Sequence, residues 1–179
     1  MTKVINFFGS AGAGKSTQAL GLTYNLKMRG LKVEYISEYA KELVFSNCTH
    51  ILLSEQLHVY SEQIFKMRIR SNLDLDYLVT DSPTLLSLYY GEKYKANSKE
   101  LSALILSEYN TYSNINFFLN RNAAFDPVGR LQNELESDND SVELKQFLNK
   151  NNISFEEYQS NDSLAGFLTY KILTEHTKK

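Results

Sequence analysis

A chain of 179 residues is long enough for one domain with a sizeable core, and its 42% hydrophobic and 22% charged residues are ordinary for a globular protein. The net charge of −2 gives no overall attraction to nucleic acid, although a local basic patch would be averaged away in this sum. The single cysteine excludes an intrachain disulfide and a Cys-rich zinc site, and no signal peptide or membrane-length apolar run is found, so we expect a soluble cytoplasmic protein.

Strand-like and helical segments alternate along the chain. The expected strands are 3–8, 32–37, 77–80, 115–119 and 153–158. The expected helices are 15–28, 54–73, 83–90, 99–112, about 140–149 and about 163–175. This alternation predicts one α/β domain over residues 1–179, with a five-stranded parallel sheet and helices on both faces.

Turn and cap residues punctuate these segments. Gly30 is expected to stop the first helix, Ser82 to cap the third helix with Pro83 at its first position, and Gly91 to end that helix. The acidic stretch 134–143 is expected to be a solvated loop and helix start.

The first strand runs into a glycine-rich loop that matches G-x-x-x-x-G-K-[ST] at every fixed position and precedes a helix. Glycines let the backbone N–H groups point at a phosphate chain, and the helix N-terminus adds partial positive charge. Lys15 is expected to reach the β- and γ-phosphates, and Ser16 to ligate Mg²⁺. The residues expected to bind the nucleotide here are Gly9, Ser10, Ala11, Gly12, Ala13, Gly14, Lys15, Ser16 and Thr17.

The motifs beyond this loop narrow the class of protein. A GTPase would carry an N-K-x-D guanine reader and a D-x-x-G motif after the third strand, whereas this chain has Asp81-Ser-Pro-Thr. Motor proteins and AAA+ ATPases are expected to need a larger framework than 179 residues. Small kinases remain, in which strand ends carry isolated acids and a later segment carries arginines.

Two acids follow predicted strands and should therefore lie at the carboxyl edge of the sheet, where open α/β proteins bind ligands. Asp81 is expected to hold a water on Mg²⁺; the alternative, a helix cap, is already supplied by Ser82. Glu38 is expected to accept the proton of an acceptor hydroxyl, unless it pairs with Lys41 one turn later.

Arginines further along the chain suit a transferring phosphoryl group, on which negative charge spreads. Arg121 ends the fourth strand and Arg130 lies in a loop with proline and glycine, so both are expected on a lid of about 121–139, unless they are solvated surface residues. Arg68 and Arg70 are expected either to hold an acceptor phosphate or to complement a helix C-terminus. The expected catalytic residues are Lys15, Glu38, Asp81, Arg121 and Arg130, and both arginines are also expected to contact ATP.

Five stretches together carry a family resemblance: FFGSAGAGKSTQALGL, VEYISEYAKELV, DYLVTDSPTLLSLYY, NINFFLNRNAAFDPVGRLQNE and ISFEEYQSNDS. They resemble the phage-encoded branch of small P-loop nucleotide kinases, which is related to the ribosylnicotinamide kinase domain and, more distantly, to nucleoside and nucleoside-monophosphate kinases. The resemblance covers nearly the whole chain. It implies a P-loop NTPase fold of the kinase type, ATP with Mg²⁺, a lid around Gly129 and Arg130, and an adenine beside segment 159–162.

The acceptor is less determined than the donor. Some members of that branch resemble kinases of 5-hydroxymethyluracil in phage DNA, which is the preferred specific hypothesis, and Lys93, Lys95 and Lys99 around Tyr94 could contact DNA or form a solvated loop. The alternatives are a free nucleoside, a nucleoside monophosphate or ribosylnicotinamide as acceptor. A protein of another class, a non-catalytic ATP sensor or an ATPase, also stays open.

Overall fold

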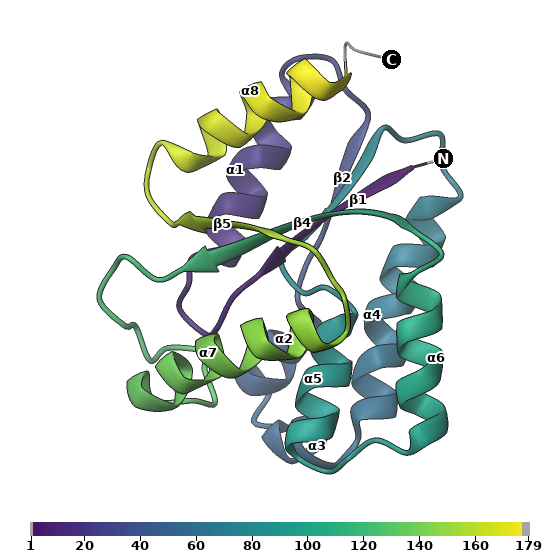
Figure 1. Ribbon diagram of the computed structural model, residues 1–179, viewed down its shortest axis with the longest axis vertical. Helices are drawn as coiled ribbons and strands as arrows, with labels where there is room; N and C mark the ends of the chain where they lie inside the picture. The colour runs from purple at the N-terminus through teal and green to yellow at the C-terminus, as the bar shows by residue number, and fades with distance from the viewer. Residues whose placement is uncertain (1, 177–179) are drawn as a thin grey trace.

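The computed structural model describes residues 2–176, and a five-stranded parallel sheet lies at its centre (Figure 1). The strand order is β2-β3-β1-β4-β5, and every neighbouring pair is parallel. The strands are β1 (Lys3–Phe8), β2 (Val33–Ile36), β3 (Tyr77–Thr80), β4 (Ser113–Asn120) and β5 (Glu156–Gln159). The predicted five-stranded parallel sheet of the α/β class is therefore confirmed.

Eight helices accompany the sheet within the described residues. They are α1 (Lys15–Lys27), α2 (Tyr39–Phe45), α3 (Thr49–Ser54), α4 (Gln56–Ser71), α5 (Leu85–Lys93), α6 (Lys99–Tyr109), α7 (Glu134–Lys150) and α8 (Leu164–His176). Helices α1 and α8 cover one face of the sheet, and α4 to α7 cover the other (Figure 1). None of the helices in residues 2–176 has the length and apolar character needed to cross a membrane.

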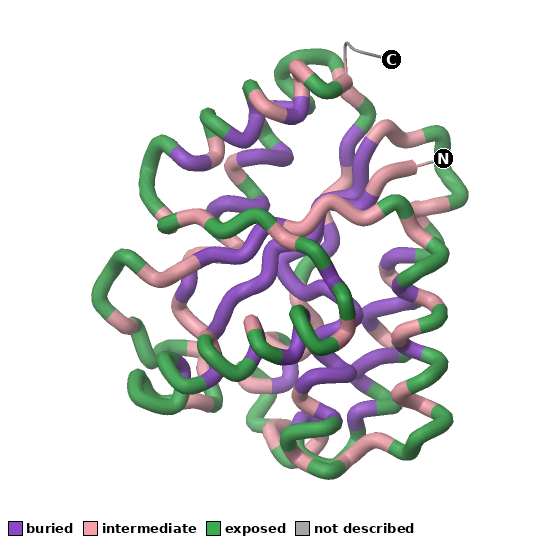
Figure 2. Tube along the Cα trace, in the orientation of Figure 1, coloured by how far each residue is buried: buried purple, intermediate pink, exposed green. Residues whose placement is uncertain are grey.

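Alternation along the strands builds a core on each side of the sheet. In β1, Ile5 and Phe7 pack against α1 and α8, whereas Val4 and Phe8 pack against the helices of the opposite face. Strands β1 and β3 in the middle of the sheet are buried along most of their length, whereas the edge strand β5 is mostly exposed and the helices turn exposed sides outward (Figure 2). One polar cluster lies within the sheet, where Asn6 of β1 donates to Asn114 and Asn116 of β4, whereas Asp81 follows the end of β3.

Several expected boundaries were wrong. Helix α5 has Thr84 rather than Ser82 at its N-cap, and it continues through Gly91 to its end at Lys93. A Cβ at Gly91 would lie 2.1 Å from the Asn97 side chain, so this glycine permits close packing and does not end the helix. The short helices α2 and α3 were not predicted.

Helix α7 begins before the predicted start at about residue 140, so the acidic stretch 134–143 is helix from its first residue. A capping box fixes that start, because Asn133 Oδ1 accepts from the Glu136 N–H while the Glu136 carboxylate accepts from the Asn133 N–H. Ser137 and Asp140 are 0% and 1% exposed, so the expectation of a solvated segment was wrong for this face of the helix.

Candidate active site

The loop between β1 and α1 has the backbone conformation that its glycines were expected to supply. Gly9, Gly12 and Gly14 have φ values of 142°, 81° and 82°, in the region that disfavours residues with a Cβ. Helix α1 starts at Lys15, directly after Gly14. The loop therefore presents backbone N–H groups and a helix N-terminus at the carboxyl edge of the sheet, which is a ready site for phosphate.

Lys15 is folded over this loop. Its Nζ donates to the carbonyl oxygens of Gly9 at 2.8 Å and Ser10 at 2.9 Å. Burial lowers the pKa of the Lys15 ammonium, and the carboxylates of Glu38 and Asp81 act in the opposite direction. The cation is thus held above the loop, and it can exchange two neutral carbonyl partners for phosphate oxygens.

Asp81 follows β3 and is 2% exposed. Its Oδ1 has no hydrogen-bond partner among the described residues, which is costly for a buried carboxylate. Burial raises the pKa of the nearby Tyr35 phenol, and the Asp81 charge raises it further. A carboxylate oxygen without a partner, together with the Ser16 hydroxyl, fits the oxygen ligands and bound waters that Mg²⁺ prefers.

Glu38 follows β2 and stands at the N-cap position of α2, but its side chain makes no capping hydrogen bond. Burial raises the pKa of the Glu38 carboxyl, and the Lys15 ammonium opposes this shift. The charge of Lys41 also favours the ionised form, although the Lys41 Nζ lies 5.8 Å from the centre of the Phe45 ring. A half-buried carboxylate without a capping bond is suited to take up a proton.

One cavity joins the phosphate loop, Lys15 and Glu38. It extends from the loop of residues 11–17 past Glu38 to α4 and α5, and the lid residues 129–132 line another part of it. Its far end is mostly apolar, and the rings of Tyr90 and Tyr94 stack there with centroids 5.8 Å apart. The residues that sequence analysis did not assign to this site are Lys41, Val44, Leu52, Gln56, Val59, Leu86 and Tyr90.

Most of these lining residues come from α2 to α5. The sequence feature that could have indicated α2 is the segment EYAKEL after β2. This helix is short, and no side chain caps its N-terminus, so the signal is weak. Nothing local indicated that Gln56 or Tyr90 would face the site, because that depends on how the helices pack against one another.

The two lid arginines have different surroundings. Arg130 lines the cavity, and its Nε donates to the Asp126 carbonyl oxygen. Arg121 does not line the cavity, because its guanidinium forms ion pairs with Glu134 and Asp138 of α7. Arg130 therefore lies beside the other residues of the cavity and Arg121 does not, and a role in transfer stays a prediction for both.

Phe125 connects the lid to the phosphate loop. Both guanidiniums lie over its ring, at 5.4 Å for Arg121 and 5.6 Å for Arg130. A Cβ at Gly12 would meet the Phe125 ring at 3.3 Å and Arg121 Cδ at 3.5 Å, so the lid approaches the loop backbone closely.

Other expected cations lie elsewhere. Arg68 pairs with Glu108 at 2.9 Å, and Arg70 donates to the Lys66 carbonyl oxygen. Neither lines the cavity, and both lie in the last turn of α4, which agrees with the alternative that they complement a helix C-terminus. Lys93 pairs with Asp140 and Glu143 but is exposed, as are Lys95 and Lys99, so the expected solvated lysine segment agrees with the structure and a DNA contact stays a prediction.

Segment 159–162 lies beside the phosphate loop. Gln18 of α1 donates to the Ser160 hydroxyl at 3.2 Å and to the Asn161 carbonyl oxygen at 2.6 Å. A Cβ at Gly14 would lie 2.2 Å from Ser160 Oγ. This segment therefore borders the loop, and its contact with an adenine stays a prediction.

Comparisons with known proteins agree with this geometry at the level of fold. A family model described as an AAA domain matches residues 4–163. No curated protein matches the chain. Among solved structures, thymidylate kinase from Ehrlichia chaffeensis is similar, with 18% identity, a TM-score of 0.56 and coverage of 97% of each chain. The family match shows that excluding AAA proteins because of the chain length was wrong. The predicted P-loop fold of the kinase type is confirmed by the structural similarity.

Proposed function

The chain belongs to the AAA domain family, and from that premise we propose that it is a kinase that transfers the γ-phosphoryl group of ATP to a hydroxyl of a nucleotide-type acceptor. One observation carries this proposal: a single cavity contains the phosphate loop, the Glu38 carboxylate and Arg130. The fold shared with a thymidylate kinase supports it further. ATP would occupy the loop side of the cavity, and the acceptor would occupy the side formed by α2, α4 and α5.

The proposed transfer uses the residues of this cavity. The acceptor oxygen attacks the γ-phosphorus, its proton passes to the Glu38 carboxylate, and the bond from the γ-phosphorus to the β,γ-bridging oxygen breaks to release ADP. Lys15 and Arg130 stabilise the negative charge on the moving phosphoryl group. Bound Mg²⁺, held through Ser16 and an Asp81-bound water, would supply further charge neutralisation on the β- and γ-phosphates.

A hydroxyl acceptor is favoured over a phosphate acceptor because of Glu38. A phosphate acceptor is already ionised and needs no base, whereas a neutral hydroxyl must lose a proton during transfer. The raised pKa of Glu38 moves this carboxyl toward the neutral range in which a general base works best.

Two observations bear on the choice between a DNA base and a free monomer. The acceptor side is bordered by α2, α4, α5 and lid residues 129–132, which suits a small molecule. Lys93, expected as a DNA contact, is already paired with two carboxylates. Both observations support a monomeric acceptor, so the hydroxymethyl group of 5-hydroxymethyluracil in phage DNA becomes the alternative to test beside it.

The test is incubation with Mg²⁺ and ATP labelled at the γ-phosphate, in parallel with nucleosides, ribosylnicotinamide, nucleoside monophosphates, hydroxymethyldeoxyuridine monophosphate and hydroxymethyluracil-containing DNA. The expected result is label on a free hydroxyl compound, and it should be absent with Lys15→Ala. Label on DNA alone would establish the alternative acceptor. Release of free phosphate without any labelled acceptor would overturn the kinase proposal in favour of an ATPase or sensor.

A further inference from the structure

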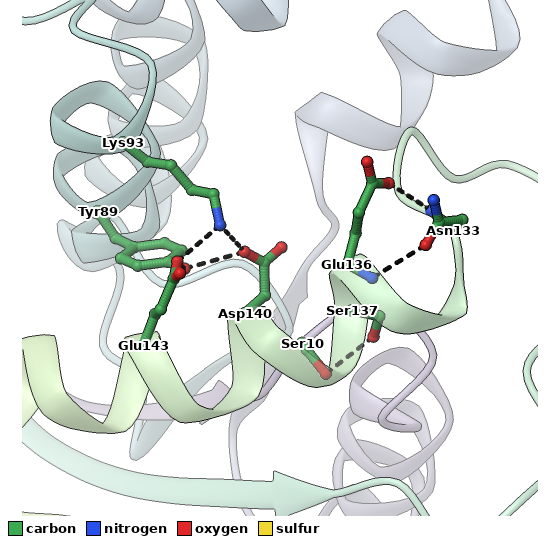
Figure 3. A network of polar contacts seen from close by, with 8 residues as sticks. All are labelled: Ser10, Tyr89, Lys93, Asn133, Glu136, Ser137, Asp140 and Glu143. Atoms are coloured by element: carbon green, nitrogen blue, oxygen red, sulfur yellow. Dashed lines mark hydrogen bonds and ion pairs between the residues drawn. The ribbon is translucent and has the colours of Figure 1, made fainter.

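Helix α7 makes polar contacts with two separate parts of the active site (Figure 3). It begins within segment 121–139, which was expected to form a lid, and two of its buried side chains, Ser137 and Asp140, project from the same helix face toward different elements. Neither side chain belongs to the cavity lining, so the proposed reaction does not use them directly.

The Ser137 contact is with the phosphate loop. Its hydroxyl lies 2.6 Å from the Ala11 carbonyl oxygen and 3.1 Å from the Ser10 hydroxyl. Ser10 is itself 2% exposed. A buried serine that donates to a loop carbonyl fixes the orientation of that peptide, and the peptides of this loop are the groups that would face phosphate.

The Asp140 contact is with α5, the helix that follows Asp81. Its Oδ1 accepts from the Tyr89 hydroxyl at 3.0 Å and from Lys93. Glu143, one turn further along α7, accepts from the same two groups at 3.1 Å and 2.7 Å. Burial raises the pKa of the Tyr89 phenol and the Asp140 charge raises it further, so this hydroxyl stays a donor.

Packing of α7 would not need this arrangement. Leu144, Phe147 and Leu148 already bury the helix in the core, whereas a carboxylate that is 1% exposed carries a desolvation cost. What the polar contacts add is direction: a hydrogen bond fixes rotation and register, which apolar contacts leave loose. Helix α5, whose register these contacts fix, supplies Leu86, Ser87 and Tyr90 to the lining of the acceptor side of the cavity.

We propose that α7 holds the phosphate loop and α5 in fixed register, with Ser137 and Asp140 as positioning residues that align the donor and acceptor sides of the cavity. The proposal rests on the proposed function only in requiring that ATP binds at the phosphate loop. Alignment of this kind matters because reacting groups must approach within roughly 3–3.5 Å in a defined direction.

Hydrogen exchange on the intact protein tests this connection without knowledge of the acceptor. Exchange of peptides covering residues 89–93 is measured with and without Mg²⁺ and a non-hydrolysable ATP analogue at about 100 times its Kd. If α5 opens only together with the loop, the analogue should slow exchange there, by up to about 100-fold. If the network has only a structural role, a substitution in it should change the exchange rate of these peptides by the same factor with and without the analogue.

Tyr89→Phe removes only the hydroxyl that reaches Asp140 and Glu143. The expected result is unchanged analogue affinity by calorimetry, retained protection of the loop and α1, and a smaller analogue-dependent protection in residues 89–93, because the ion pairs of Lys93 with Asp140 and Glu143 remain. Tyr170→Phe is the matched control, because Tyr170 is 73% exposed on α8 and should behave as wild type. Asp140→Ala removes the acceptor of both Tyr89 and Lys93 and should reduce this protection at least as much as Tyr89→Phe.

Three outcomes would overturn the proposal. One is protection in residues 89–93 that is as large in Tyr89→Phe as in wild type. Another is a wild-type protein whose loop is protected while residues 89–93 are not, which leaves the proposed function standing. Absence of any calorimetric binding to wild type would overturn both the positioning role and the proposed function.

Discussion

Replacing Gly14 with alanine should reveal how closely the phosphate loop is fitted to segment 159–162. Gly14 has a φ of 82°, which costs an L-residue about 1–2 kcal/mol. The new Cβ would lie 2.2 Å from Ser160 Oγ and 3.2 Å from Ser160 Cβ, a crowding worth about 1–3 kcal/mol. The two costs together predict a loss of about 2–5 kcal/mol in the free energy of unfolding.

The matched control is Gly30→Ala. Gly30 has a φ of 83°, nearly that of Gly14, but a Cβ there would meet nothing within 4 Å. Its expected cost is therefore the backbone strain alone, about 1–2 kcal/mol. The difference between the two variants isolates the contact with Ser160, and in a protein of this size about 1–3 kcal/mol corresponds to roughly 2–12 °C in Tm.

The assay is urea denaturation at 25 °C, supported by thermal unfolding. The double variant Gly14→Ala/Ser160→Ala removes the nearest atom and should bring the cost of the alanine at 14 close to that seen at Gly30. Ser160→Ala by itself loses only the hydrogen bond from Gln18, worth about 0.5–1.5 kcal/mol. The reasoning is refuted if Gly14→Ala costs no more than Gly30→Ala, or if its cost is the same in the Ser160→Ala background.

Three further predictions concern the cavity. Lys15→Ala should lower kcat/KM for ATP at least about 10²-fold in initial-rate assays, because the moving charge loses a fixed countercharge; normal rates would contradict this. Glu38→Gln should keep the ATP affinity measured by calorimetry but slow transfer about 10²–10⁴-fold. Because burial raises the pKa of Glu38, the acid limb of the wild-type pH–rate profile should lie above the usual carboxyl range, and it should disappear in this variant. Because burial raises the pKa of Glu38 in the folded protein, its ionised form lowers the free energy of unfolding at neutral pH. Glu38→Gln should therefore raise Tm at neutral pH. This gain should vanish below about pH 4, where the carboxyl is protonated in the unfolded chain as well. Arg130→Ala should reduce kcat about 10³-fold or more with a smaller effect on ATP affinity, and a fully active variant would remove Arg130 from the transfer step.

The part of the protein that could be predicted is the part whose structure is decided by near neighbours in the chain. Strand β1, the glycine loop and the start of α1 follow one another without a gap, and their pattern of apolar residues, glycines, lysine and serine was enough to place all three. The acids after β2 and β3 were placed at the sheet edge by the same reasoning, since the end of a parallel strand has a known position.

The acceptor side of the site could not be predicted in this way. Gln56 and Tyr90 face the cavity because α4 and α5 pack with a particular rotation beside the sheet, and no local feature of either helix specifies it. Arg121 and Arg130 looked equivalent as lid arginines, but the carboxylates of Glu134 and Asp138 hold the first away from the cavity.

The sequence by itself determined the phosphate loop and the individual strands, because each depends on residues within a few positions of one another, and the alternation of strands with helices then predicted a parallel sheet and the edge at which the acids gather. Only the tertiary structure decided which charged side chains are free to meet a substrate and which are already paired. Asp140 shows the physical reason: it looks like a solvated residue in an acidic stretch, but Tyr89 and Lys93 make its burial possible, and they lie about fifty residues away in the chain.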